Sequence, residues 1–454
     1  MAFKNIFSKA KSKSKVAVIG LDGVPYDLIG HLVNTGKMPA LAAILKEGGS
    51  GKMRSSIPPV SSVAWTTFMT GVNPGKHGIF GFIDLKDHSY DPYFPNFSHI
   101  KSPPLWDLIA AHKKRTIAIN IPQTYPAREI NGVLISGFVA INLQKAVYPP
   151  SIYPKLTEMD YRIDVNYEEA AEKKEEFFTD LFYTLQKRGE ALKYFLNNEP
   201  WDLFIGVFTG TDRLHHYFWN EYEDPQGAYH KKFIDYYTQV DTIIGELVDS
   251  LPKHCHLLIM ADHGFCALKQ EVFPNTWLKE KGYLKLKKDP PGSFSDIHPE
   301  SKAFVLDPGR LCINLKGRMP SGCVEPGKEY EALREELTEG LMGIRYPSAP
   351  STPIIEQIFR KEEIFSGPYL NRAPDLVLHG LPGYDIKGSM SKESLFGKGK
   401  FTGMHTYPDA FLYLRGANLN DNHGIVDLAP SILHLLNIPL PSHFDSKPFS
   451  VLLQ

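Results

Sequence analysis

The 454-residue sequence is poor in cysteine and carries almost no net charge. Its four cysteines, Cys255, Cys266, Cys312 and Cys323, show no CxxC spacing, which indicates reduced thiols and a cytoplasmic location. The formal net charge of −1 lacks the basic excess that nucleic-acid binders carry. We therefore expect no binding of nucleic acid.

The sequence also lacks long apolar runs. The N-terminus, MAFKNIFSKAKSKSK, has no apolar stretch of the length that a secretion signal needs, and no window reaches the length of a membrane span. Its five lysines could contact an anionic membrane surface weakly, although a solvated, disordered tail is the more common role of a short basic end. We assign residues 1–15 to this basic tail.

Short apolar strands alternate with helices in the first 265 residues. The pattern predicts strands near 15–23, 116–122, 132–138, 201–212 and 256–264, and helices over 37–47, over 169–197 and from the fourth strand to about residue 250. This alternation favours an open, largely parallel sheet covered on both faces.

The alternation of strands and helices ends after Gly264. Residues 266–400 are rich in loops, with a short strand near 310–315 and a helix near 328–342, and we interpret them as an insertion or cap. The sheet resumes at DAFLYLRG, so the predicted catalytic core comprises residues 16–265 and 401–454.

Three of the predicted strands end in potential metal ligands. These are Asp22, Asp212 and the pair Asp262-His263, and His216 follows Asp212 by four residues, one helical turn. Sites in open α/β sheets collect outside the carboxyl ends of the strands, so these residues can converge. Carboxylates and imidazoles together suit zinc or manganese better than calcium. Alternatively, each aspartate is a helix N-cap and His216 a core residue.

Residues 57–82, IPPVSSVAWTTFMTGVNPGKHGIFGF, crowd five Ser or Thr hydroxyls into ten positions and contain no acid in that stretch of ten. Such hydroxyls are poor nucleophiles until their pKa is lowered, and otherwise they only pack at a helix start. The sequence has no GxSxG elbow, and GVNPGKHG is one residue short of a phosphate loop.

The motifs VIGLDG, PPVSSVAWTTFMTGVNPGKHGI, TGTDRLHHYFW, MADHGF and GMHTYPDAFLYLRG resemble those of the alkaline phosphatase superfamily. The most similar branch is the type I phosphodiesterase/nucleotide pyrophosphatase group, with its predicted phosphohydrolases and phosphomutases. The resemblance spans residue 16 to about 265 and 403 to the end. It implies an α/β fold, an alkaline-phosphatase-like three-layer sandwich with a largely parallel central sheet and a cap.

The resemblance also implies two neighbouring divalent ions, zinc in most members and manganese in some. Matched by motif, one ion would be held by Asp22, Asp262, His263 and the oxygen of the nucleophile. The other ion would be held by Asp212, His216 and His405. The family's nucleophile lies nine positions before the threonine of its T-G-x-x-P motif, which is Thr70 here, so the nucleophile would be Ser61.

The implied function is hydrolysis of a small phosphorylated substrate, a nucleotide or another phosphoester, through a phosphoseryl intermediate on Ser61. Activation by a metal ion would explain why no acid stands beside Ser61. One alternative is a phosphomutase or phosphotransferase that uses the same phosphoseryl enzyme. Another is a catalytically silent relative that binds a phosphorylated ligand, although all six ligand side chains and the nucleophile are present.

Several basic residues and one alanine qualify this implication. Ala64 stands where nucleotide phosphodiesterases of the group carry an asparagine that contacts a phosphoryl oxygen, so the preference for monoesters or diesters stays open. We expect structural roles for Lys76 and His77. Four later lysines belong either to a mobile lid or, as we expect, to a solvated loop: Lys387, Lys392, Lys398 and Lys400.

Overall fold

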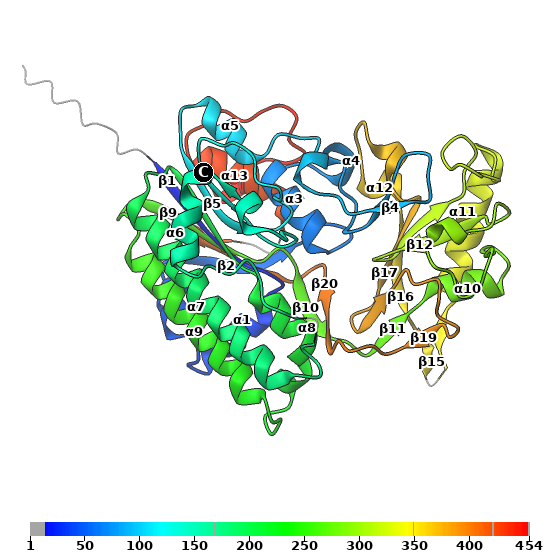
Figure 1. Ribbon diagram of the computed structural model, residues 1–454, viewed down its shortest axis with the longest axis horizontal. Coiled ribbons are helices and arrows are strands. Elements are labelled where there is room, and N and C mark those ends of the chain that lie inside the picture. The colour runs from blue at the N-terminus through cyan, green and yellow to red at the C-terminus, as the bar shows by residue number, and fades with distance from the viewer. Residues whose placement is uncertain (1–13, 168, 348, 420–421, 453–454) are drawn as a thin grey trace, which may run out of the picture.

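The computed structural model describes residues 14–167, 169–347, 349–419 and 422–452. The predicted basic tail lies outside these residues except for Ser14 and Lys15, and its contact with a membrane stays a prediction. Lys15 already opens the first strand of the sheet. Figure 1 shows a larger lobe that carries this sheet and a smaller lobe beside it.

The larger lobe is built on a nine-stranded sheet in the order β22-β2-β21-β9-β1-β8-β5-β6-β7. Its strands are β1 (Lys15–Leu21), β2 (Gly48–Arg54), β5 (Thr116–Ile121), β6 (Gly132–Ser136), β7 (Val147–Tyr148), β8 (Leu203–Phe208), β9 (Cys255–Met260), β21 (Ala410–Arg415) and β22 (His423–Gly424). Five of the eight neighbouring pairs are parallel, so the mostly parallel sheet is confirmed. The central strands are apolar and nearly fully buried because helices cover both faces.

Helices lie on both sides of this sheet (Figure 1). One side carries α1 (Tyr26–Asn34), α2 (Pro39–Leu45), α7 (Lys174–Asn198), α8 (Gly210–Glu223) and α9 (His230–Asp249). The other carries α3 (Ser61–Thr70), α5 (Leu105–Ala111) and α13 (Leu428–Leu435). No single described helix is long and apolar enough to cross a membrane, although α1 and α2, bent by 110°, reach that length and composition as a pair.

Two features of the larger lobe differ from the sequence prediction. The single helix expected up to residue 250 is two helices, α8 and α9, because Pro225 prevents residue 224 from continuing the first one. Strand β2, GGSGKMR, was not predicted because its glycines hide the apolar pattern. A Cβ on Gly48 would lie 2.2 Å from the Leu414 carbonyl oxygen, so the close approach of β21 requires glycine there.

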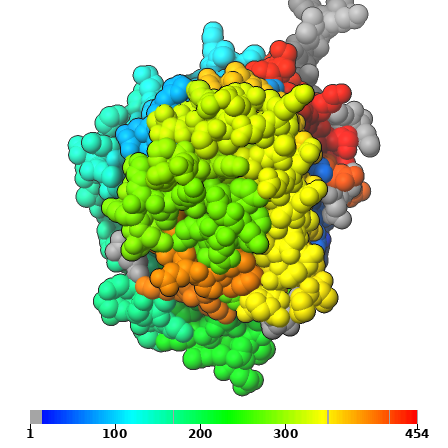
Figure 2. All heavy atoms as spheres, turned by 90° about the vertical axis from the view of Figure 1, so that its right-hand side faces the viewer, coloured from blue at the N-terminus to red at the C-terminus, as the bar shows by residue number. Residues whose placement is uncertain are grey.

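The smaller lobe has its own hydrophobic core and an antiparallel sheet in the order β12-β13-β17-β16. Its main elements are β12 (Ala303–Leu306), β13 (Arg310–Ile313), β16 (Ile355–Arg360), β17 (Leu376–Gly380), α10 (Pro274–Glu280), α11 (Lys328–Met342) and α12 (Lys361–Ile364). They fall within the predicted 266–400 insertion, but Leu85 and Tyr90 also pack into this core. Figure 2, turned to face this lobe, shows its green-to-yellow segments covering that side of the molecule.

Short strands connect the two lobes. The chain enters the smaller lobe after β10 (Gly264–Ala267) and returns through β20 (Gly403–Thr406), which pairs antiparallel with β10 and places His405 opposite Phe265. Next to this junction, β11 (Gln270–Val272) pairs parallel with β18 (Tyr384–Ile386). Elsewhere between the lobes, the short helix α4 (Pro74–His77) accepts a hydrogen bond at the Gly75 carbonyl from the Tyr369 amide. The return strand therefore carries a predicted metal ligand back to the sheet.

A glycine in β1 allows α3 to pack closely on the sheet. A Cβ on Gly20 would lie 2.6 Å from Trp65 Cη2, so we expect Gly20→Ala to lower the free energy of unfolding by about 1–3 kcal/mol. Urea unfolding followed by fluorescence measures this loss. Gly30→Ala in α1 is the control, because its Cβ would contact nothing within 4 Å. Equal stability of the two variants would contradict this packing argument.

Candidate active site

The loops after β1, β8 and β9 bring the predicted strand-end ligands together. Asp22 directly follows β1, and Asp262 and His263 follow β9. His263 Nε2 lies 3.7 Å from Asp22 Oδ1 and 3.5 Å from Asp262 Oδ2, and all three side chains are buried. The predicted convergence at the carboxyl edge of the sheet is therefore present, and we call these three residues the Asp22 cluster.

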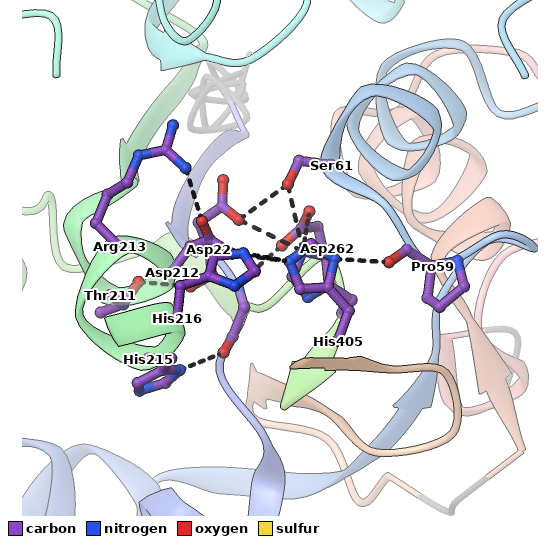
Figure 3. Close-up of polar contacts among 12 residues, drawn as sticks. Asp22, Pro59, Ser61, Thr211, Asp212, Arg213, His215, His216, Asp262 and His405 are labelled. Atoms are coloured by element: carbon purple, nitrogen blue, oxygen red, sulfur yellow. Dashed lines mark hydrogen bonds and ion pairs between the residues drawn. The ribbon is translucent and has the colours of Figure 1, made fainter. Parts of the chain in front are cut away.

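A second group, the Asp212 cluster, adjoins the first. Asp212 lies in the first turn of α8 and His216 one turn later, with His216 Nε2 3.4 Å from Asp212 Oδ1. His405 on β20 completes the group, because its Nε2 lies 3.1 Å from Asp212 Oδ1 and 3.0 Å from His216 Nε2. The rings of His263 and His405 stack with centroids 3.7 Å apart, so the two clusters form one continuous site. Figure 3 shows Asp22, Asp212, His216 and His405 close to one another.

Ser61 is the hydroxyl that reaches this site. It is the first residue of α3, and its Oγ lies 3.3 Å from Asp22 Oδ1 (Figure 3). The same Oγ lies 3.3 Å from His263 Nε2. Thr66 and Thr70 donate to carbonyls of the preceding helical turn, and Thr67 bonds to His77. Ser61, which the spacing from Thr70 in the family motif predicted as the nucleophile, is thus the hydroxyl of this stretch that contacts an aspartate and a histidine of the predicted site.

Several ligand atoms are oriented as metal ligands require. His405 Nδ1 bonds to the Pro59 carbonyl at 2.9 Å, and His263 Nδ1 bonds to the Gly264 carbonyl at 3.0 Å. A proton on each Nδ1 leaves the Nε2 lone pairs directed into the site. Asp262 Oδ2 is buried and accepts no hydrogen bond from any residue that the structure describes. The donor set therefore has free lone pairs where cations would sit.

The buried charges also call for cations. Burial, Asp262 and Asp212 raise the pKa of Asp22 well above its usual range, and burial raises the pKa of Asp262 to about 8. Against the effect of burial, His216, His405 and Arg213 hold the pKa of Asp212 well below its usual range. Asp212, His216 and His405 have ligand atoms within 4.8 Å of one another, and so do Asp22, Asp212 and His263. With Asp262 and Ser61 beside them, these three carboxylates, three imidazoles and one hydroxyl fit two divalent ions of the zinc or manganese type.

Sequence reasoning missed the residues that hold these ligands in place. Trp65, which follows Ala64, donates a hydrogen bond from its Nε1 to Asp22 Oδ2 at 3.2 Å. Arg213 Nη1 donates to Asp212 Oδ2 at 2.9 Å, and its Nη2 donates to Asp164 at 2.7 Å. Because Arg213 follows Asp212 in the sequence, it could have been predicted to contact that carboxylate. No sequence pattern predicts its contact with Asp164.

The structure also places the residues whose roles were in question. Ala64 is fully buried, and its methyl side chain has no donor to take the place of the asparagine. Lys76 forms an ion pair with Asp445, and buried His77 bonds to Thr67 Oγ1 at 3.1 Å. These contacts agree with the predicted structural roles of Lys76 and His77.

The four later lysines divide into two kinds. Lys392, Lys398 and Lys400 are exposed, as a solvated loop predicts, and Lys400 pairs with Glu172. Lys387 departs from that prediction because it is half-buried in a cavity wall that His216 also lines. Its Nζ pairs with Asp385 at 2.5 Å, which explains how a lysine is accommodated there.

Comparison with known proteins identifies the family. Residues 16–408 match the family described as type I phosphodiesterase / nucleotide pyrophosphatase. The chain belongs to this family. It is therefore a phosphoester hydrolase of the alkaline phosphatase superfamily, in a family that typically depends on divalent metals. No curated protein sequence matches it.

Solved structures share the fold at low sequence identity. Phosphonoacetate hydrolase from Sinorhizobium meliloti 1021, in complex with phosphonoformate, is 15% identical, with a TM-score of 0.63 over 94% of this chain and 95% of that chain. Human ectonucleotide pyrophosphatase / phosphodiesterase 5 is 15% identical, with a TM-score of 0.56 over 95% and 97%. An inactive threonine-to-alanine variant of the murine protein, in complex with AMP, is 16% identical, with a TM-score of 0.53 over 95% and 97%. These matches confirm the predicted α/β architecture.

For the metal-free protein, we expect the free energy of unfolding to fall as the pH rises. Folded Asp262 has a pKa of about 8 against 3.8 as its ordinary value, so the folded state keeps a proton that the unfolded state loses. Burial lowers the pKa of His215 and His216 to about 3, so these two residues make stability rise with pH, but only below about pH 6.5, where the unfolded chain protonates them. Between pH 6.5 and 8 we expect a loss of about 1–2 kcal/mol.

Thermal unfolding with EDTA, and with zinc or manganese, measures this slope. The loaded protein should lose little stability over the same pH interval, because bound cations keep the carboxylates ionised in the folded state. A chelated protein equally stable at both ends of the interval would contradict the buried-carboxylate argument.

Trp65→Phe should weaken metal binding at the Asp22 cluster while keeping an aromatic ring in place. Loss of the indole donor to Asp22 predicts a rise in dissociation constant of about 10–100-fold. Competition with a chromophoric chelator measures it. Trp106→Phe is the matched control, because Trp106 is also buried but its Nε1 has no hydrogen-bond partner among the described residues. Equal metal affinities of the two variants would contradict the inference that Trp65 supports metal binding.

Proposed function

We propose that the protein is a two-metal phosphoester hydrolase in which Ser61 is the nucleophile and carries a phosphoseryl intermediate. The observation that supports this most directly is the place of the Ser61 hydroxyl, 3.3 Å from both Asp22 and His263 at the N-terminus of α3. A buried serine hydroxyl against a carboxylate and an imidazole is the arrangement of an activated nucleophile.

The two clusters divide the ligands between two ions. Asp22, Asp262, His263 and Ser61 would hold one divalent cation, and Asp212, His216 and His405 would hold the other. When bound, the cations supply positive charge that favours the deprotonated serine and the departing oxygen. Zinc is the first choice for this donor set, and manganese also fits it.

The chain's own groups account for binding, proton transfer and displacement. Ser61 Oγ attacks phosphorus in line as the bond to the leaving oxygen breaks, and the leaving oxygen keeps the electron pair. The hydroxyl proton passes to solvent water, because Asp22 Oδ1 and His263 Nε2, the two groups in contact with Oγ, would be occupied as metal ligands. Backbone amides at the start of α3 would bind phosphoryl oxygens. Water then attacks the phosphoseryl ester and restores Ser61.

The substrate in this proposal is a small phosphorylated molecule, such as a nucleotide. The family description and the AMP complex of the murine structural neighbour support that class. Transfer of the phosphoryl group to an alcohol instead of water would make the enzyme a phosphotransferase or phosphomutase, and product analysis with added alcohol separates these reactions. A cytoplasmic location is consistent with four free cysteines.

Ser61→Ala should abolish turnover of mono- and bis-(4-nitrophenyl) phosphate by at least about 10³-fold with zinc or manganese. Thr66→Ala, in the same helix, removes a hydroxyl that donates to the Ser62 carbonyl and should retain activity within a few-fold. Acid quenching of the wild type should trap one phosphoryl group on Ser61, detected by peptide mass. An active Ser61→Ala variant would exclude this mechanism, and so would a metal-loaded wild type that is inactive on all phosphoesters.

A further inference from the structure

A cavity of about 420 Å³ opens beside the Asp212 cluster, between the two lobes. On one side, residues 57–60 lead into α3 and end next to Ser61. On the other side, β17 and β18 of the smaller lobe form the wall. His216 and His405 are part of the lining, so the cavity is continuous with the candidate active site.

Most of the cavity wall is apolar. Its aromatic and large aliphatic side chains are Ile57, Val60, Phe82, Ile83, Val377, Leu378, Tyr384, Ile386, Phe401, Met404 and Tyr407. The Phe401 ring lies 4.5 Å from the His216 ring between centroids, so apolar surface begins directly at a predicted metal ligand. A group that enters the cavity from the site therefore leaves water for an apolar environment.

The charges on the wall are mostly negative. Lys387 is paired with Asp385 at 2.5 Å, which cancels the charge of both. Asp307 accepts a hydrogen bond from the Gly388 amide, and Glu356 faces His379 at 3.7 Å. Burial lowers the pKa of His379, so its neutral ring does not compensate Glu356. Asp307 is also close enough to Lys387 to raise the pKa of that lysine, so the lining holds three carboxylates, Asp307, Glu356 and Asp385, against one lysine and has an excess of negative charge.

In-line displacement connects this cavity to one part of the substrate. Ser61 contacts the Asp22 cluster, and the leaving oxygen departs from the opposite side of phosphorus. With phosphorus bound between the two clusters, the leaving oxygen would face the Asp212 cluster, whose His216 and His405 line the cavity. The leaving group, rather than the phosphoryl group retained on Ser61, meets this wall.

We propose that the cavity binds the leaving group and selects phosphoesters whose leaving group is apolar and uncharged, such as an aryl or alkylaryl alcohol. The apolar wall favours such a group, and Asp307 and Glu356 repel a polyanionic group such as pyrophosphate. The inference rests on the proposed hydrolase function and adds its substrate class. It predicts that this member of a nucleotide pyrophosphatase family is a poor pyrophosphatase.

The first test varies only the leaving group. Thymidine 5′-monophosphate esters of 4-methyl- to 4-pentylphenol have similar leaving-group acidity, and kcat/KM should rise by up to about fourfold per added methylene. Thymidine triphosphate, which releases pyrophosphate from the same thymidylyl group, should have a kcat/KM at least tenfold below that of the 4-nitrophenyl ester.

The second test changes the wall. Glu356→Lys should raise kcat/KM for thymidine triphosphate relative to the 4-nitrophenyl ester at least fivefold at low salt, because Glu356 is 52% exposed and tolerates the change. Glu335→Lys is the matched control, since Glu335 is an exposed residue of α11 in the same lobe and does not line the cavity. Its ratio of the two kcat/KM values should stay at the wild-type level.

The outcomes separate the two levels of the proposal. Activity that is independent of chain length, or equal for the triphosphate and the aryl ester, would overturn the cavity's role alone. A ratio that moves equally in Glu356→Lys and Glu335→Lys would do the same. A metal-loaded wild type that cleaves none of these substrates would overturn the proposed hydrolase function and this inference with it.

Discussion

The structure depends on a cluster of buried carboxylates that cannot all be ionised without cations. Asp22, Asp212 and Asp262 meet at one edge of the sheet, where burial alone would favour their neutral forms. The surrounding contacts fix these groups in place: Trp65 on Asp22, Arg213 on Asp212, and the Gly23 amide on Asp262. Burial of these charges costs stability unless positive charge balances them, so the site suits the divalent cations on which the family typically depends.

The fold places the two clusters side by side, with the Ser61 hydroxyl against one of them. Parallel strands β1, β8 and β9 bring two acid–imidazole clusters to the same edge, and the start of α3 places a hydroxyl against one of them. The chain then leaves after β10, builds the smaller lobe, and returns through β20 with His405. Chemistry is thus contributed almost entirely by the larger lobe, whereas the smaller lobe supplies half of the wall that a leaving group would touch.

The sheet and five of the proposed ligands, Asp22, Asp212, His216, Asp262 and His263, were predictable from local signals, whereas His405 and Ser61 were assigned only through the resemblance to the family. An apolar strand that ends in Asp or Asp-His marks its own carboxyl end, and the four-residue step to His216 follows the helical period. Strand β2 was not predictable, because its glycines are dictated by the approach of β21, far away in sequence. The partnership of Arg213 with Asp164, the packing of Leu85 and Tyr90 into the smaller lobe, and the inward place of Lys387 are likewise long-range contacts without a local pattern.

Anomalous diffraction from crystals loaded with zinc tests the central claim most directly. The account predicts two anomalous peaks in each chain, one among Asp22, Asp262, His263 and Ser61 and the other among Asp212, His216 and His405. Data collected on both sides of the zinc absorption edge identify the element at each peak. A single peak, or peaks away from these seven side chains, would contradict the two-ion site on which the proposed role of Ser61 rests.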